Sequence, residues 1–175
     1  MPLTFGIANC ITAVRAVLVV LAATAIGRSP TPSAAWFVVA MAIAATVLDG
    51  VDGWAARRFG QSSAFGARFD MEVDALLIMA LSVLAWTYGK AGVWVLASGL
   101  LRYVFVVAGR IWPWMERPLL PSRRRQAVCV IQIVALIVVV SPIAAPPASV
   151  LIAAAALVVL AGSFVVDTVW LIRQA

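Results

Sequence analysis

The chain has 175 residues, of which 65% are hydrophobic and 11% are charged. Typical globular domains are roughly half apolar and about a quarter charged, so this composition excludes an ordinary soluble protein. The net charge is +6 and histidine is absent, which excludes imidazole ligands. Nucleic-acid binding is disfavoured because the arginines lie between apolar segments rather than on a soluble face. At about 20 residues per membrane crossing, we predict an all-α integral membrane protein with a single domain over residues 1–175.

Six apolar segments follow one another along the chain, and each is predicted to be a transmembrane helix. The first covers residues 11–26 and ends at the turn-forming sequence GRSPTPS. The second covers residues 34–48 and continues as a polar helix through DGVDGWAARRFG. The third covers residues 63–88. The remaining three segments are expected at residues 93–112, 127–140 and 150–172, with the basic sequence MERPLLPSRRRQ before the fifth.

The basic residues are distributed unequally between the two sides of this predicted bundle. If both termini lie on one side, that side holds every arginine except Arg28, while Arg28 and Lys90 lie opposite. Cytoplasmic loops of membrane proteins are enriched in lysine and arginine. We therefore expect a multi-pass protein of the cytoplasmic (inner) membrane with both termini in the cytoplasm.

Five of the seven acidic residues fall at the junction of the second and third segments. Asp49 and Asp52 are three residues apart, and Asp70 and Asp74 are four apart, so each pair shares one face of a helix. The short connection predicts an antiparallel hairpin at the cytoplasmic side, in which the four carboxylates meet and Glu72 points away. Carboxylates close to the hydrocarbon are costly, and a functional role is the default interpretation.

Four converging carboxylates would repel one another without a cation. Hard oxygen ligands without histidine favour Mg²⁺, Mn²⁺ or Ca²⁺ over zinc, and Mg²⁺ often completes its shell with substrate phosphates. Gly53 and Gly66 permit close approach to the backbone, and Arg57 can grip a phosphate with its planar fork. These residues predict a metal site for a diphosphate. The alternative is that the aspartates pair with Arg57, Arg58 and Arg68 in a solvated loop.

The segment DGVDGWAARRFGQSSAFGARFDMEVD, residues 49–74, resembles the signature of the CDP-alcohol phosphotransferase (CDP-alcohol phosphatidyltransferase) family. The N-terminal NCITAVR, with Asn9, Thr12 and Arg15, resembles the NxxTxxR segment of the same family. The signature positions that match are Asp49, Asp52, Gly53, Ala56, Arg57, Gly66, Asp70 and Asp74.

The resemblance implies an enzyme of phospholipid biosynthesis that depends on two Mg²⁺ or Mn²⁺ ions. Such an enzyme transfers a phosphatidyl or similar substituted phosphoryl group from CDP-diacylglycerol, or another CDP-linked donor, to a small alcohol and releases CMP. By this resemblance Asp49, Asp52 and Asp70 are metal ligands, and Asp74 is both a ligand and the general base. The residues implied in the nucleotide and diphosphate pocket are Gly53, Ala56, Arg57, Gly66, Asn9 and Thr12.

Basic residues around the fourth and fifth segments are the best sequence evidence for the acceptor. They bind either a phosphorylated acceptor or the anionic headgroups of membrane lipids as a topology anchor. Asp167, in the last segment, has two open interpretations, a pair with a buried arginine such as Arg102 or a homodimer contact. The candidate acceptor-binding arginines are Arg102, Arg110, Arg117, Arg123, Arg124 and Arg125.

An ion-coupled transporter is the alternative function, because it also needs carboxylates within the membrane. Such a transporter predicts charges near the bilayer midplane and an inverted repeat. Here the carboxylates gather at one end of one hairpin, and no repeat is evident in the sequence. The enzyme is therefore the favoured interpretation.

Overall fold

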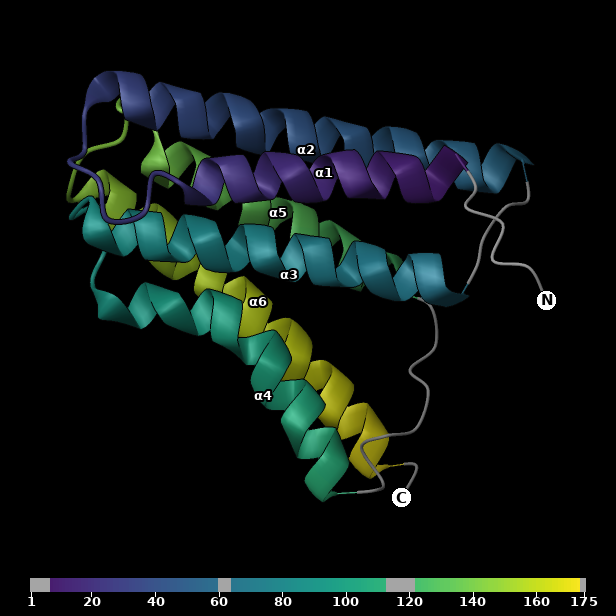
Figure 1. The fold of residues 1–175 in the computed structure, drawn as a ribbon. Helices are drawn as coiled ribbons and strands as arrows, with labels where there is room; N and C mark the ends of the chain where they lie inside the picture. The colour runs from purple at the N-terminus through teal and green to yellow at the C-terminus, as the bar shows by residue number, and fades with distance from the viewer. Residues whose placement is uncertain (1–6, 60–63, 113–121, 174–175) are drawn as a thin grey trace.

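The computed structural model describes residues 7–59, 64–112 and 122–173, and all of their regular secondary structure is helical (Figure 1). Side chains are described for residues 11–51, 66, 68–112 and 122–173. The helices are α1 (Ile7–Ala23), α2 (Pro32–Phe59), α3 (Ala64–Thr87), the short 3-10 helix η1 (Val93–Leu96), α4 (Ala97–Ile111), α5 (Arg123–Val140) and α6 (Ala148–Ile172).

Local sequence signals set the ends of the first helices. Gly27, just beyond α1, has φ +82°, a left-handed conformation that glycine adopts without steric cost. Proline is favoured in the first turn of a helix, and α2 begins at Pro32. The Thr31 hydroxyl accepts a hydrogen bond from the Ala34 N–H at 3.2 Å, which caps this helix. The predicted turn between the first two segments therefore has a local physical cause.

Small side chains bring α1 and α2 close together. Ala22 of α1 and Val38, Ala42 and Ala45 of α2 have no exposed surface, and α1 packs chiefly against α2. Short side chains let helix backbones approach closely, which is how membrane helices gain packing energy. Larger side chains fill the centre of the bundle, where Leu81, Leu84 and Leu136 are fully buried.

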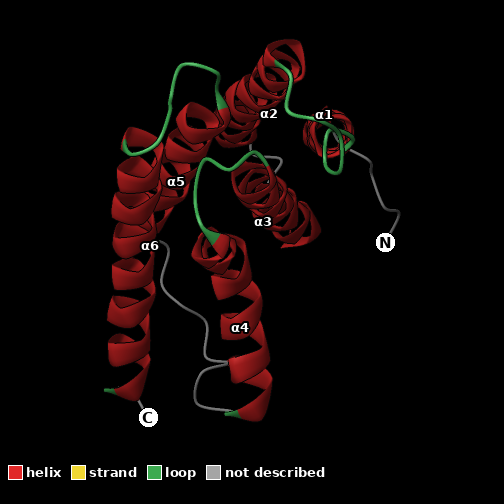
Figure 2. Cartoon of the chain, turned by 90° about the vertical axis from the view of Figure 1, so that its left-hand side faces the viewer, coloured by secondary structure: helices red, strands yellow, loops and turns green. Residues whose placement is uncertain are grey.

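The helices α4 and α6 diverge from the rest of the bundle (Figures 1 and 2). The helix α4 begins against α3, where the buried Gly99 contacts Met79 closely, and it then leans away toward its C-terminal end. The helix α6 packs mainly on α5 and follows α4 in the same direction. Side chains of α3, α4, α5 and α6 line a cavity between these four helices.

Among the described residues, three helical stretches are long and apolar enough to cross a membrane, namely Pro32–Val51, Val93–Ile111 and Ala148–Ile172. The stretch Ile11–Ala23 is apolar but shorter. Large hydrophobic side chains face outward, for example Leu151 at 67% and Val158 at 71% exposure. These surfaces suit a lipid environment, and the helices indicate a membrane protein.

The predicted segments differ from the observed helices at the first, where α1 begins four residues earlier and ends three residues earlier than predicted, and at the fifth. The helix α5 begins at Arg123, four residues before the predicted start at residue 127, and includes all three arginines of SRRRQ. Arginine is a good helix former, so the basic residues extend the apolar helix instead of forming a loop before it. As a consequence, these arginines occupy defined positions on helix faces.

Candidate active site

Three of the predicted aspartates, from α2 and α3, converge beside α1, which packs against both of these helices. Asp49 lies on α2, and Asp70 and Asp74 lie one turn apart on α3. One carboxylate oxygen from each residue lies within 4.8 Å of the other two, and all three residues are partly buried. Asp52 also lies on α2, but its side chain is outside the described residues. The helices α2 and α3 therefore bring at least three carboxylates together, although the two helices pack against α1 rather than against each other as the predicted hairpin would.

Arg15 of α1 reaches into the middle of this cluster. Its Nη1 lies 2.8 Å from Asp49 Oδ1 and also contacts Asp70 Oδ1, while its Nη2 donates to Asp74 Oδ1 at 2.5 Å. The Nε donates to the carbonyl of Ala45 at 3.1 Å. The side chain is only 1% exposed. A single guanidinium thus contacts all three carboxylates and anchors itself on the backbone of α2.

Arg15 is not among the site residues predicted from the sequence. The arginines near the predicted hairpin, such as Arg68, were the alternative partners of the aspartates, but Arg68 is exposed. Two signals could have identified Arg15. It is a cation in the middle of an apolar segment, and it closes the NCITAVR motif. Intramembrane charges usually face a partner inside the protein.

The carboxylate cluster fits a hard divalent cation by its chemistry. Asp49, Asp70 and Asp74 offer only oxygen donors, and these are close enough to share an ion. Mg²⁺ and Mn²⁺ prefer such ligands, commonly with water or phosphate oxygens completing the shell. The donor set is therefore compatible with the metal that the sequence predicted.

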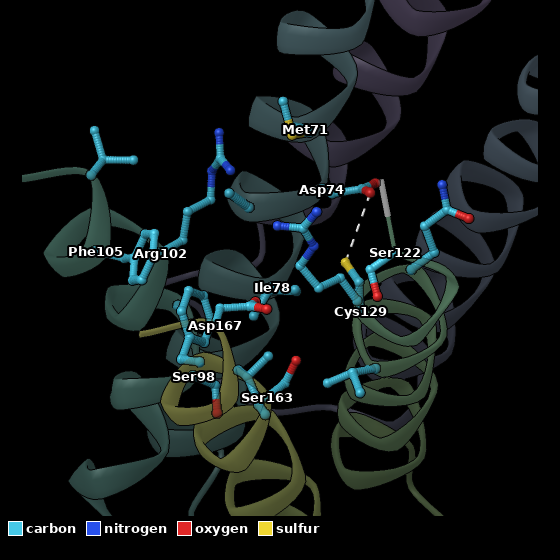
Figure 3. A pocket seen from close by; sticks show the side chains of 18 residues that line it. Met71, Asp74, Ile78, Ser98, Arg102, Phe105, Ser122, Cys129, Ser163 and Asp167 are labelled. Carbon is cyan, nitrogen blue, oxygen red and sulfur yellow. Dashed lines mark hydrogen bonds between the residues drawn. The ribbon is translucent and has the colours of Figure 1, made fainter. Parts of the chain in front are cut away.

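A cavity of about 550 Å³ adjoins the cluster and is lined by residues of α3, α4, α5 and α6. Asp74 belongs to its wall, and the Cys129 thiol of α5 donates to Asp74 Oδ2 at 3.8 Å (Figure 3). Arg102 and Phe105 line the cavity from α4 (Figure 3), and Arg125 lines it from α5. The cavity thus joins a carboxylate of the cluster to two cationic side chains.

The structure separates the candidate acceptor arginines into groups. Arg102 and Arg125 line the cavity, and Arg102 also forms an ion pair with Glu72. Arg110 and Arg123 are exposed and are not among the residues that line it. Arg117 lies outside the described residues.

Arg124 instead connects two helices. It pairs with the carboxylate of Asp167 on α6, and its Nη1 donates to both the carbonyl and the hydroxyl of Ser163 at 3.0 Å. Asp167 lies in the cavity wall, and its side chain is 12% exposed. The partner of Asp167 is therefore an arginine, as one interpretation expected, but it is Arg124 rather than Arg102.

The residues expected in the nucleotide pocket are only partly described. Thr12 is buried on α1, three residues before Arg15 and so on the same face of the helix. Gly66 lies near the start of α3 and is partly buried. The others lie in α1 or α2, but their side chains are outside the described residues; they are Asn9, Gly53, Ala56 and Arg57.

Comparison with known proteins identifies the family. The model of the CDP-alcohol phosphatidyltransferase family matches residues 5–166, which is almost the whole chain. The chain belongs to the CDP-alcohol phosphatidyltransferase family. This membership confirms the resemblance that the acidic signature indicated. A CDP-alcohol phosphatidyltransferase transfers a phosphatidyl group from a CDP-linked donor to an alcohol. Searches of curated proteins and of solved structures found no match.

Proposed function

We propose that this CDP-alcohol phosphatidyltransferase transfers the phosphatidyl group of CDP-diacylglycerol to a small phosphorylated alcohol and releases CMP. One observation carries the proposal. Asp74 belongs both to the carboxylate cluster and to the wall of the cavity that Arg102 and Arg125 line. A group held in the cavity by these arginines would therefore lie beside the carboxylates that handle the diphosphate.

The aspartates of the hairpin are the proposed metal ligands. Asp49, Asp70 and Asp74 would hold Mg²⁺ or Mn²⁺ together with Asp52, and we expect two ions. When bound, these ions would supply positive charge that neutralises the charge developing on the leaving CMP. The convergence of three carboxylates supports this assignment.

Asp74 is the proposed general base. Its Oδ2 lies toward Cys129 on the cavity side, so it can accept the proton of an acceptor hydroxyl bound there. The acceptor oxygen attacks the phosphorus that carries the diacylglycerol, and the bond from that phosphorus to CMP breaks. The proton of the hydroxyl moves to Asp74. This direct displacement needs no covalent intermediate with the protein.

Arg102 and Arg125 are the proposed ligands of the acceptor phosphate. They approach the cavity from α4 and from α5, and arginine forms strong paired hydrogen bonds with phosphate oxygens. Of the six arginines predicted to bind the acceptor, we therefore propose these two. The exposed Arg110 and Arg123 fit the alternative, a topology anchor at anionic lipid headgroups.

The donor nucleotide needs a pocket beside the carboxylate cluster. We propose that Thr12 and Gly66 shape its pocket with Asn9, Gly53, Ala56 and Arg57. The buried position of Thr12, on the face of α1 that carries Arg15, supports this assignment. We further propose that all six helices cross the inner membrane as one domain. The charges of α3 and α5 lie in the first half of each helix, which leaves an apolar remainder for the bilayer.

The test is CMP release by the purified protein with Mg²⁺ and CDP-diacylglycerol. Candidate acceptors are supplied in pairs, glycerol 3-phosphate with glycerol and inositol phosphate with inositol. We expect release with a phosphorylated acceptor and little with its partner. Asp74→Asn should lower the rate about 10²–10⁴-fold, which is the usual contribution of a general base, while the helical circular-dichroism signal is retained.

Two results would contradict the proposal. Absence of CMP release with every acceptor would show that the protein does not use CDP-diacylglycerol with this class of acceptor. The transporter interpretation would then be tested by measuring ion flux in proteoliposomes. Turnover of Asp74→Asn at the wild-type rate would remove Asp74 as the base without affecting the reaction class. Comparison of Mg²⁺ with Mn²⁺ in the same assay identifies the preferred ion.

A further inference from the structure

The buried guanidinium of Arg15 has no part in the steps proposed above, although it lies at their centre. It contacts the Oδ1 atom of Asp49, of Asp70 and of Asp74. The Arg15 side chain is 1% exposed, while the three carboxylates are 29%, 35% and 20% exposed. The arginine therefore lies beneath the cluster, on its protein side, and the carboxylates keep an accessible side.

One cation cannot be the full counter-charge of this cluster. Three carboxylates and one guanidinium leave a net negative charge if all four groups are ionised, and Asp52 adds a further carboxylate to the same region of the sequence. Each carboxylate nevertheless has one oxygen engaged by Arg15. A divalent ion at these carboxylates would be repelled by the guanidinium and would share its ligands with it.

We propose that Arg15 is a resident counter-cation of the carboxylate cluster. It holds the three carboxylates together without a metal, and it weakens the binding of divalent ions by competing for the same carboxylates. This inference rests on the proposed function, because it takes these aspartates to be metal ligands. Its consequence is that Arg15 tunes the metal affinity of the site from within the protein.

A purely structural role of Arg15 makes the opposite prediction. If the guanidinium only positions the carboxylates as ligands, its loss scatters them and metal affinity falls. If the guanidinium competes with the metal, a neutral residue of similar length removes its repulsion of the ion and its contacts with the carboxylates. Metal affinity then rises. Arg15→Gln therefore separates the two roles by the sign of its effect. Arg15→Lys keeps the charge but lacks the planar fork that contacts several carboxylates at once, so it should be a weaker competitor.

The experiment measures Mn²⁺ binding to the purified full chain in detergent, by the electron paramagnetic resonance signal of free Mn²⁺, without any lipid substrate. We expect Arg15→Gln to bind Mn²⁺ at least about tenfold more tightly than wild type, and Arg15→Lys about threefold more tightly. The matched control is Arg28→Gln, which removes one positive charge from an exposed loop residue. Its affinity should equal that of wild type.

Thermal unfolding in EDTA and in Mn²⁺ gives a second measurement. Without metal, Arg15→Gln should melt at a lower temperature than wild type, because the carboxylates repel one another. Mn²⁺ should raise its melting temperature more than it raises that of wild type. If Arg15→Gln cannot be purified, Arg15→Lys decides the question, since a structural role predicts weaker Mn²⁺ binding for it and competition predicts tighter binding.

Asp70→Asn distinguishes failure of this inference from failure of the proposed function. In one outcome, Asp70→Asn weakens Mn²⁺ binding relative to wild type, while both Arg15 variants bind Mn²⁺ as tightly as wild type or more weakly. This outcome would overturn the inference and leave the metal site intact. Absence of Mn²⁺ binding to wild type and to every variant would overturn the metal site and the inference together.

Discussion

The two arginines in the cavity differ from the neighbouring arginines by position rather than by residue type. Arg123, Arg124 and Arg125 are consecutive, yet Arg123 is exposed, Arg124 pairs with Asp167, and Arg125 lines the cavity. Consecutive residues of a helix point about 100° apart because one turn has 3.6 residues. One short basic sequence therefore supplies a surface charge, a tie between helices and a candidate ligand.

We predict that Arg125→Gln raises the KM for a phosphorylated acceptor by about tenfold to a hundredfold, with a smaller effect on kcat. The expected loss is one or two charge-assisted hydrogen bonds, worth about 1.5–3 kcal/mol. Steady-state kinetics of CMP release would measure it. Arg123→Gln is the matched control, since it removes the adjacent charge outside the cavity. Equal effects of the two substitutions would show that the positive charge acts on the membrane surface and not on the acceptor.

At the scale of single residues, the sequence predicts the aspartates of the candidate site and the two cavity arginines, but it misses the partner of the aspartates, Arg15. The spacing of Asp70 and Asp74 is a property of one helix, so it can be read from the sequence. The contact between Arg15 and Asp74 joins residues 59 positions apart, and it depends on how α1 lies against α2 and α3. Spacing within a helix carries no information about such a partner. In the sequence, only the NCITAVR motif, which ends at Arg15, indicated that this part of α1 belongs to the site.

At the scale of helices, the contact between α3 and α4 is set by a glycine. A Cβ atom added to Gly99 would lie 2.8 Å from the Cα of Met79 and 2.8 Å from its sulfur. Because one neighbour is backbone, a side-chain rearrangement alone cannot relieve the contact. The two helices can approach this closely only without a side chain at position 99, and Gly99 itself lines the cavity.

We predict that Gly99→Ala destabilises the protein by about 1–3 kcal/mol, as overpacked sites commonly do. Thermal unfolding in detergent would measure the loss. Gly162→Ala on α6 is the matched control, because a Cβ at that position meets nothing within 4 Å. Alanine has the higher helix propensity, so this control should be neutral or slightly stabilising. Equal stability of the two variants would contradict the close packing of α4 on α3.

The apolar segments predict the helices well, because hydrophobic stretches bounded by glycine, proline and serine are visible in the sequence. Two features were not predictable in this way. The fourth segment starts as the 3-10 helix η1 before α4, and α4 and α6 diverge from the bundle. Both features depend on packing between helices. The partner of Asp167 also depends on it, since α5 and α6 together place Arg124 beside that carboxylate.

At the scale of the whole molecule, the polar chemistry gathers at one end. The carboxylate cluster, the cavity arginines and the Arg124–Asp167 pair lie at the end of the bundle where α3 and α5 begin and α4 and α6 finish (Figure 1). The loop with Arg28 and the turn with Lys90 lie at the other end. This division agrees with the distribution of charge from which the orientation was predicted.

We predict that the end with the cluster faces the cytoplasm, which single cysteines would test in a background of Cys10→Ser and Cys129→Ser. Ser29→Cys, in the loop between α1 and α2, should react with a membrane-impermeant maleimide in intact cells. Gln174→Cys should react only after the membrane is permeabilised. Reaction of both positions in intact cells, or of Gln174→Cys alone, would contradict six crossings with cytoplasmic termini.

The burial of Arg15 also bears on the biogenesis of the protein. During translation α1 leaves the ribosome before α2 and α3, so its arginine meets the lipid before its acidic partners exist. An arginine at the centre of a lone helix costs about 2.5–3.5 kcal/mol on insertion scales, and the apolar stretch of α1 is short. We therefore expect α1 to enter the lipid late. It should remain near the insertion machinery until α2 and α3, whose aspartates neutralise the charge of Arg15, have also been inserted.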